Sequence, residues 1–341
     1  MITPDTWQSA APDAAAAAPE TAAAAADTAR LTAFPGPVRL TAQLVRSFGQ
    51  LGLQANVWAG GVFLLAFFVG SWRMGVFGLL GAVVSTATAY ALGVDRGRIE
   101  LGLEGFSGCL TGLALFVFLG PSLSTCLLTV VGAVVCVLIY AAFTALLAPW
   151  RLPVLTAPFC VVGGALLTAA PAFTRVWHGD SPAFVPVRAT GGTTYTWTDL
   201  WHGFFANIAE VGLSAHWYVG AIMLVGLFVA GIRPGLAAVV GSALAVLLAW
   251  GLGAPPGAVA AGVYGYNAVL VAIALGTLFL AGTVSTALYT LVGVAVATVL
   301  TAALNAYFAP FGGRTLSWPF IITTWLFLAA ATSFPRIRRT A

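Results

Sequence analysis

The chain has 341 residues, of which 60% are hydrophobic and only 7% are charged, and its mean hydropathy is +0.98. A water-facing surface needs far more charge, so this composition excludes a soluble globular protein and indicates one that crosses a membrane several times. The net charge of +4 comes entirely from arginine, because the chain has no lysine, and these arginines lie between apolar stretches. We therefore expect membrane lipid as a partner and no nucleic acid.

The chain begins with an Ala/Pro/Thr/Asp-rich tract, residues 1–35, which lacks the basic start and apolar core of a signal peptide. Its composition predicts a disordered tail. After it we expect a first repeat over 36–172, a polar connecting loop over 173–198, a second repeat over 199–334 and a short tail over 335–341.

The two predicted repeats match each other at a nearly constant spacing. The segment GLEGFSGCLTG at 102–112 returns 160 residues later as GVYGYNAVLVA at 262–272. Near the end of each half, LTAPF at 155–159 returns as LSWPF at 316–320. The spacing between equivalent positions is therefore only one residue longer there. A duplicated membrane protein is usually built around a pathway shared by its halves, so we expect the functional site at their interface.

Each half contains five apolar runs, and a helix needs roughly 20 such residues to cross a membrane. The runs are 57–71, 75–93, 102–119, 122–148, 152–172, 217–231, 235–252, 260–281, 284–307 and 316–334. Each half also begins with a shorter amphipathic run, 37–53 or 199–213, which is expected to enter the membrane and turn back. A helix lying flat at the interface is the alternative.

An odd number of spans in each half gives the two halves opposite orientations in the membrane. The expected fold is therefore an all-α integral membrane protein made of two inverted repeats, with ten spans and two re-entrant half-helices. The arginines predict its orientation: with the N-terminus in the cytoplasm, ten lie on the inner side and four on the outer side. We accordingly expect both tails to be cytoplasmic, the connecting loop to be extracellular and the protein to lie in the inner cell membrane.

No cluster in the sequence indicates a metal, a cofactor or a catalytic centre. All four cysteines lie inside apolar runs, where a small hydrophobic side chain is the expected role; they are Cys109, Cys126, Cys136 and Cys160. The three histidines are scattered over loops and segment ends, at His178, His202 and His216. An enzyme needs convergent polar groups, so we do not expect an enzyme.

The pattern G-[LV]-x-G-[FY]-x-x-x-L, followed in each half by L-[TS]-x-P-F, resembles the urea transporter family. The resemblance covers both halves, from about Arg46 to the C-terminal end, and includes Gln50 and Asn56 with a counterpart at Glu210. It implies ten crossing helices plus two re-entrant ones, with one pore in each protomer and a homotrimeric assembly. It also implies urea as the solute.

The resemblance implies a selectivity filter with named residues. An apolar slot that presses on the flat faces of the solute is expected from Phe106, Leu110, Tyr266 and Leu270. Hydroxyls at the centre of the filter are expected from Thr156 and Ser317, and two ladders of carbonyl acceptors from the surroundings of Gln50 and Glu210, with vestibule walls at Leu53 and Val211. Without the resemblance, an aromatic residue at such spacing is more often lipid-facing or core filler. Glu210 alone is equally well a solvated residue at a mouth.

The two repeats differ beside the slot, where Glu104 and Ser107 stand in the first half and Asn267 in the second. All three are candidate modulators. An acidic group in this place could accept a hydrogen bond from the solute or bind a proton. The alternative is that Glu104 pairs at the end of its helix with Arg96 or Arg98.

These features together predict passive, channel-like diffusion of urea. Urea is neutral and planar, with N–H donors on two edges, and stripping it of water costs several kcal/mol unless the pore supplies new acceptors. The chain has no Walker motif and no acidic chain threading the membrane, so no pump is expected. Two alternatives stay open: a proton-coupled secondary transporter using Glu104 and Glu210, and a channel for a short amide or ammonia.

Overall fold

A computed structural model of the protein describes residues 36–177 and 194–340. Within these residues the chain is helical, and its only extended pairing is an isolated bridge between Leu280 and Arg339. The tail expected over 1–35 lies outside the described residues, as do residues 178–193 of the expected connecting loop.

The first half contains seven α-helices in the described part of the chain. They are α2 (Pro37–Gly49), α3 (Val57–Gly70), α4 (Trp72–Ala91), α5 (Arg96–Glu100), α6 (Gly105–Leu119), α7 (Leu123–Leu147) and α8 (Ala157–Ala169). The second half repeats this order with α9 (Trp197–Ala209), α10 (Trp217–Ala230), α11 (Ile232–Gly251), α12 (Pro256–Ala260), α13 (Tyr266–Ile273), α14 (Val284–Phe308) and α15 (Trp318–Ala331). The main difference is that α13 ends in a π-helical turn, Ala274–Leu278, where α6 continues as an α-helix.

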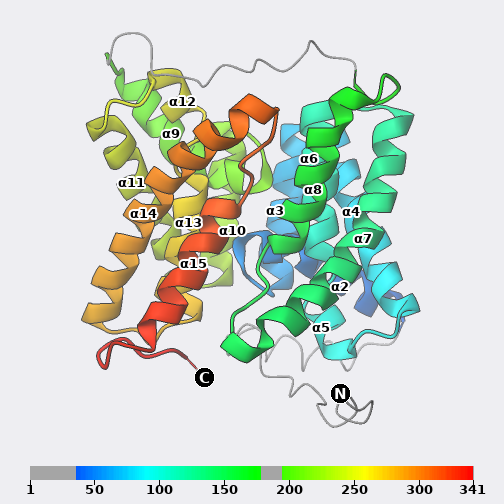
Figure 1. Cartoon of the computed structure of the whole chain (residues 1–341), viewed down its shortest axis with the longest axis horizontal. Helices are drawn as coiled ribbons and strands as arrows, with labels where there is room; N and C mark the ends of the chain where they lie inside the picture. The colour runs from blue at the N-terminus through cyan, green and yellow to red at the C-terminus, as the bar shows by residue number, and fades with distance from the viewer. Residues whose placement is uncertain (1–35, 178–193, 341) are drawn as a thin grey trace, which may run out of the picture.

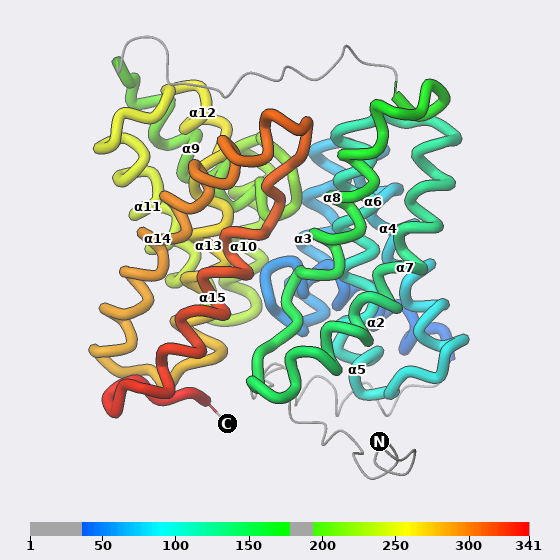
Figure 2. Tube along the Cα trace, in the orientation of Figure 1, coloured from blue at the N-terminus to red at the C-terminus, as the bar shows by residue number. Residues whose placement is uncertain are grey.

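The halves lie side by side, with equivalent elements at opposite ends of the molecule (Figure 1). The short helix α5 lies at the end where the chain terminates, and its counterpart α12 lies at the other end. The Cα trace shows the same reversal at the centre, where the chain rises into α8 but descends into α15 (Figure 2). The duplicated sequence therefore forms a duplicated series of elements, in which α8 and α15 run in opposite directions.

Helix length distinguishes the elements. Among the described residues, four helices are long and apolar enough to cross a membrane: Trp72–Ala91, Leu123–Trp150, Ile232–Gly251 and Val284–Phe311. The shorter apolar helices are Gly105–Leu119, Ala157–Ala172, Tyr266–Leu278 and Trp318–Ala331. A straight crossing of a membrane needs about 20 residues, so the length of these four helices does not by itself show that they cross it. The apolar helices agree with a membrane protein, whereas the count of ten spans stays a prediction.

Each half begins with a sharply bent helix pair. The segment Pro37–Gly52 meets α3 at 79°, and Trp197–Gly212 meets α10 at 73°. Such a bend occurs either in a broken membrane span or in a re-entrant segment. A 3-10 turn closes the first helix of each pair, after which Leu53 and Leu213 adopt left-handed conformations with φ of 60° and 64°. A left-handed leucine costs roughly 1–3 kcal/mol and persists only where the surrounding packing imposes it.

Glycine allows the two members of each bent pair to pack closely. A Cβ at Gly60 of α3 would lie 2.0 Å from the carbonyl oxygen of Val45, and one at Gly220 of α10 would lie 1.8 Å from that of Phe205. Any side chain at either position would separate the helices. In both repeats the first helix of the bent pair therefore packs closely against the second through a glycine.

The interface between the halves is formed by α3 against α10, by α8 against α15 and by the two 3-10 turns. Phe63 of α3 is fully buried and lies over Gly226 of α10. Trp325 of α15 donates from its indole nitrogen to the carbonyl of Pro153, just before α8, over 2.7 Å. These contacts bring the two proline-containing motifs together at the centre of the molecule.

Candidate functional site

Two hydroxyl residues begin the central helices. Thr156 is the N-cap of α8 and Ser317 is the N-cap of α15, and both are buried, with 2% and 6% of their surface exposed. A proline follows in the first turn of each helix, at Pro158 and Pro319, where a missing N–H costs little. Both prolines therefore stand where an α-helix tolerates them.

The hydroxyl of Thr156 is weakly satisfied. Its Oγ1 is buried and has no hydrogen-bond partner among residues 36–177 and 194–340. The thiol of Cys160, one turn along α8, lies beside the hydroxyls of both Thr156 and Ser317, so the two halves converge on this cysteine. A thiol is a weak hydrogen-bonding group. A buried hydroxyl next to such a group needs a further partner, which a polar solute or a water can supply.

The residue before each hydroxyl is a leucine in a left-handed conformation. The φ angles are 54° at Leu155 and 45° at Leu316, and leucine rarely adopts such values. Both leucines are buried. The chain therefore turns sharply at the same point of each repeat, and this turn sets the direction in which the hydroxyl and the neighbouring carbonyl point. Such strained positions cluster at functional sites.

The second half restrains its turn with two side chains. Tyr266 donates from its phenol to the carbonyl of Leu316 over 2.6 Å. Asn267 donates to the same carbonyl over 3.5 Å and to the hydroxyl of Thr301 over 3.2 Å, and its Oδ1 accepts from the backbone N–H of Phe320 over 3.2 Å. Asn267 thus spans the break before α15 and positions Ser317.

The first half lacks this restraint. Its equivalent residues are Phe106, which has no hydroxyl, and Ser107, which is too short to span the break. The Oγ of Ser107 is buried without a hydrogen-bond partner in the described residues. The polar atoms beside Thr156 are therefore less satisfied than those beside Ser317. This difference in hydrogen bonding arises where the repeats differ in sequence, with Ser107 in the first half and Asn267 in the second.

The residues expected to form the apolar slot lie in the interior. Phe106, Leu110 and Leu270 are buried in the main hydrophobic cluster, with 4%, 2% and 2% of their surface exposed, and Tyr266 is half-buried against the same cluster. They lie on the equivalent helices α6 and α13. The structure places them in the protein rather than on its outer surface, and their contact with a solute stays a prediction.

The ends of the two half-helices differ in polarity. Gln50 is buried and donates from Nε2 to the carbonyl of Leu101 over 2.8 Å, which ties the first half-helix to the segment before α6. Glu210 is only half-buried, and its carboxylate forms no ion pair or hydrogen bond within the described ranges 36–177 and 194–340. It lies near enough to Tyr266 for its negative charge to act on that phenol.

The proposed vestibule walls follow these polar residues. Val211 is buried in the 3-10 turn after α9, and Leu53 is the half-buried left-handed residue after α2. Both pack against the main hydrophobic cluster. Each therefore lies at the bend of its helix pair.

Glu104 is engaged by an arginine. It forms an ion pair and hydrogen bond with Arg98, whose guanidinium lies over the ring of Tyr140 at 4.6 Å from the ring centroid. Of the two expected partners, Arg98 is the one that the structure shows. The carboxylate is almost fully buried, and its Oε2 has no hydrogen-bond partner in the described part of the chain. The ion pair therefore balances the charge of Arg98.

Sequence reasoning missed Cys160, which it treated only as a small hydrophobic residue. The spacing of four between Thr156 and Cys160 places both on one helix face and would have indicated their proximity. It also missed the bond from Tyr266 to Leu316, because nothing in the sequence marks Leu316 as left-handed. No group of three or more His, Cys, Asp or Glu side chains suited to a metal ion occurs in the described residues.

Comparison with known proteins points to one family. A family model described as "Urea transporter" matches residues 41–332. The chain is similar to urea transporter 1 of Ovis aries, with 28% identity over 311 residues that cover 89% of this chain and 80% of the relative. It is also similar to urea transporter 1 of Rattus norvegicus, with 29% identity over 304 residues that cover 87% of this chain and 78% of the relative.

Proposed function

Because the chain belongs to the urea transporter family, we propose that it carries urea across a membrane by passive, channel-like diffusion through a filter between its two halves. The family consists of transporters or channels rather than enzymes. The observation that carries the filter is the pair of buried helix-start hydroxyls, Thr156 and Ser317, which come from different halves and meet beside Cys160.

The filter matches the chemistry of urea. The weakly satisfied hydroxyl of Thr156 replaces part of the hydration of one edge of the solute, while Ser317 faces it from the other repeat. Phe106, Leu110, Tyr266 and Leu270 press on the flat faces, so a hydrated ion cannot pass without losing its water. Gln50 and Glu210 begin ladders of acceptors along the pore, with Leu53 and Val211 at its mouths.

The proposed architecture is a pair of inverted repeats, each with five spans and a re-entrant half-helix. The opposed directions of α8 and α15 and the two bent helix pairs support it. We further propose a homotrimer with one filter in each protomer, by resemblance to the family. The distribution of the arginines supports a protein of the inner cell membrane with both termini in the cytoplasm.

Replacing Thr156 by valine tests the filter. Valine keeps the size of threonine but removes its hydroxyl, so one hydrogen bond to the solute is lost at about 1–2 kcal/mol, and urea flux falls roughly tenfold. Stopped-flow light scattering of proteoliposomes measures that flux. The matched control is Thr298→Val on α14, where the buried hydroxyl only bonds back to the carbonyl of Val294. Unchanged flux in Thr156→Val would contradict the proposed filter.

A further inference from the structure

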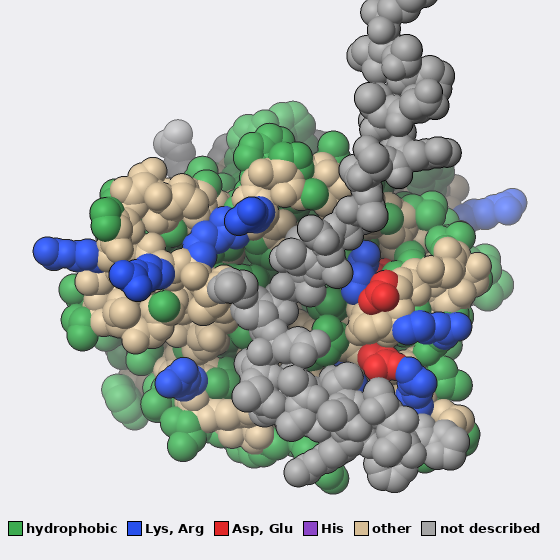
Figure 3. Space-filling model, turned by 90° about the horizontal axis from the view of Figure 1, so that it is seen from below, with side chains coloured by type: hydrophobic (Ala, Val, Ile, Leu, Met, Phe, Trp, Pro, Cys, Tyr) green, Lys and Arg blue, Asp and Glu red, His purple; other side chains and the backbone are tan. Residues whose placement is uncertain are grey.

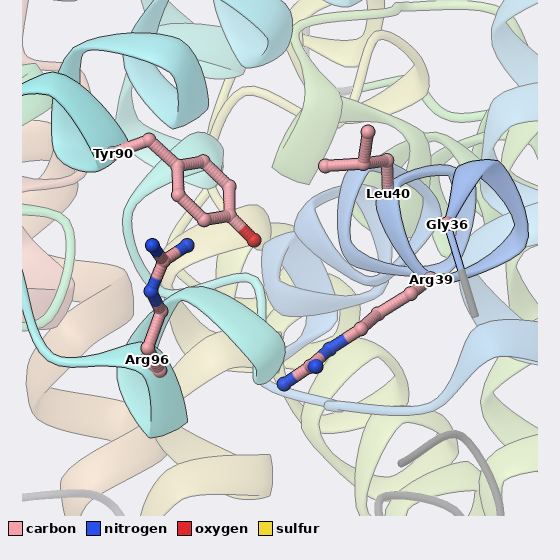
Figure 4. Close-up of a pocket in the computed structure, with 5 residues that line it drawn as sticks. All are labelled: Gly36, Arg39, Leu40, Tyr90 and Arg96. Atoms are coloured by element: carbon pink, nitrogen blue, oxygen red, sulfur yellow. The ribbon is translucent and has the colours of Figure 1, made fainter. Parts of the chain in front are cut away.

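A pocket of about 340 Å³ lies outside the proposed filter, between the start of α2 and the connection from α4 to α5. It is lined by Gly36, Arg39, Leu40, Tyr90 and Arg96, of which the two arginines approach from different helices (Figure 4). The pocket lies at the end of the molecule that carries both described chain ends. On this face arginine side chains outnumber acidic ones (Figure 3).

Among the residues that the structure describes, the pocket holds one positive charge that no carboxylate balances. Arg39 forms an ion pair with Glu100. The guanidinium of Arg96 lies over the ring of Tyr90, 4.3 Å from the ring centroid, and pairs with no acidic side chain in residues 36–177 and 194–340. Tyr90 is itself held by a hydrogen bond of 2.8 Å to Gln43. Stacking thus fixes the unbalanced charge in place while leaving its N–H groups for a ligand.

The repeat indicates that the fold does not require these arginines. In the second half Asp199 replaces Arg39 and Pro256 replaces Arg96, yet α9 and α12 have the same lengths as α2 and α5. Asp199 instead forms a capping box with Thr196. The equivalent helices form at the same lengths without the two cations, so helix formation does not account for the unpaired Arg96.

We propose that this pocket binds the phosphate of an anionic phospholipid head group. Guanidinium groups pair with phosphate oxygens through parallel charge-assisted hydrogen bonds, and basic pockets at the end of membrane helices are suited to lipid head groups. The surroundings favour a lipid over a soluble phosphate. Leu40 in the pocket wall is half exposed, which provides an apolar surface for the acyl chain.

Thermal unfolding of the detergent-purified full chain tests the proposal. We expect phosphatidylglycerol to raise the unfolding midpoint in a saturable way, while phosphatidylcholine and inorganic phosphate leave it unchanged. In Arg96→Gln the phosphatidylglycerol concentration for the half-maximal rise increases about fivefold, as for the loss of one cation near a lipid head group. Arg96 is exposed, so this substitution leaves the core intact.

The matched control is Arg336→Gln, which removes an exposed arginine of the C-terminal segment outside the pocket. This control should titrate like the unmodified protein. An equal increase in both variants would show that the lipid responds to the overall positive charge of the protein rather than to this pocket. That result would overturn the proposal. So would a wild-type response to inorganic phosphate as large as that to phosphatidylglycerol, or an unchanged titration in Arg96→Gln.

Discussion

The phenol of Tyr266 donates a hydrogen bond of 2.6 Å to the carbonyl of Leu316, the left-handed residue immediately before Ser317. In the first half the equivalent residues are Phe106 and Leu155, and phenylalanine has no hydroxyl to form this bond. The two sides of the proposed filter therefore share a backbone conformation but differ in how firmly side chains hold it.

Replacing Tyr266 by phenylalanine should loosen the second half of the filter while keeping the ring. We expect a loss of about 1 kcal/mol in stability, the usual contribution of one hydrogen bond. We also expect a several-fold decrease in urea flux, because the turn before Ser317 is no longer fixed. Thermal unfolding and stopped-flow measurements on the same preparation give both quantities.

The matched control for that experiment is Tyr289→Phe. Tyr289 of α14 also donates to a backbone carbonyl, that of Phe327, over 2.8 Å, but none of the proposed filter residues takes part. This variant should lose similar stability and retain its flux. Equal flux loss in both variants would show that flux follows general stability rather than the Tyr266 bond.

Because Leu316 has a left-handed conformation, we expect glycine to be more stable than alanine at this position, which is the reverse of the usual order inside a helix. Both substitutions remove the same buried side chain, but only glycine adopts a φ of 45° without strain. We therefore expect Leu316→Gly to be more stable than Leu316→Ala by about 1 kcal/mol. At Leu247, an exposed position inside α11, alanine should be the more stable by about the same amount. Unfolding midpoints of the four variants check this, and greater stability of Leu316→Ala would contradict it.

Urea entry should move no protons. The carboxylate of Glu104 is paired with Arg98, and a passive filter has no step that requires protonation. Proteoliposomes loaded with a pH-sensitive dye and placed in a urea gradient should show the same internal pH as protein-free vesicles. A urea-driven pH change that disappears in Glu210→Gln would instead support proton-coupled transport.

Much of this molecule could be predicted from its sequence because the repeat supplies an internal comparison. The equivalence of Thr156 and Ser317 follows from matching one half to the other, whereas their place in a filter comes only from the resemblance to the family. The all-helical membrane class follows from composition. These predictions depend on residue type and spacing, which the sequence displays directly.

What the sequence could not predict depends on backbone conformation and on pairing between distant residues. Leucine is a good helix former, so nothing marks Leu155 or Leu316 as left-handed; packing between the halves imposes that conformation. The choice of Arg98 over Arg96 as partner of Glu104 is likewise decided by geometry, because Arg96 stacks on Tyr90 instead. The lengths of the shorter helices also differ from the apolar runs, since apolar residues continue into turns.

The most direct measurement of the central claim compares solutes in one set of proteoliposomes. A narrow, flat-sided filter with acceptors on its edges should pass urea and the short planar amides, and it should exclude glycerol, which is not planar. We predict from stopped-flow swelling that the urea permeability, corrected for protein-free vesicles, exceeds that of glycerol by at least about tenfold, the ratio that ~1.4 kcal/mol of discrimination supplies. Glycerol permeability equal to or greater than that of urea would contradict the account.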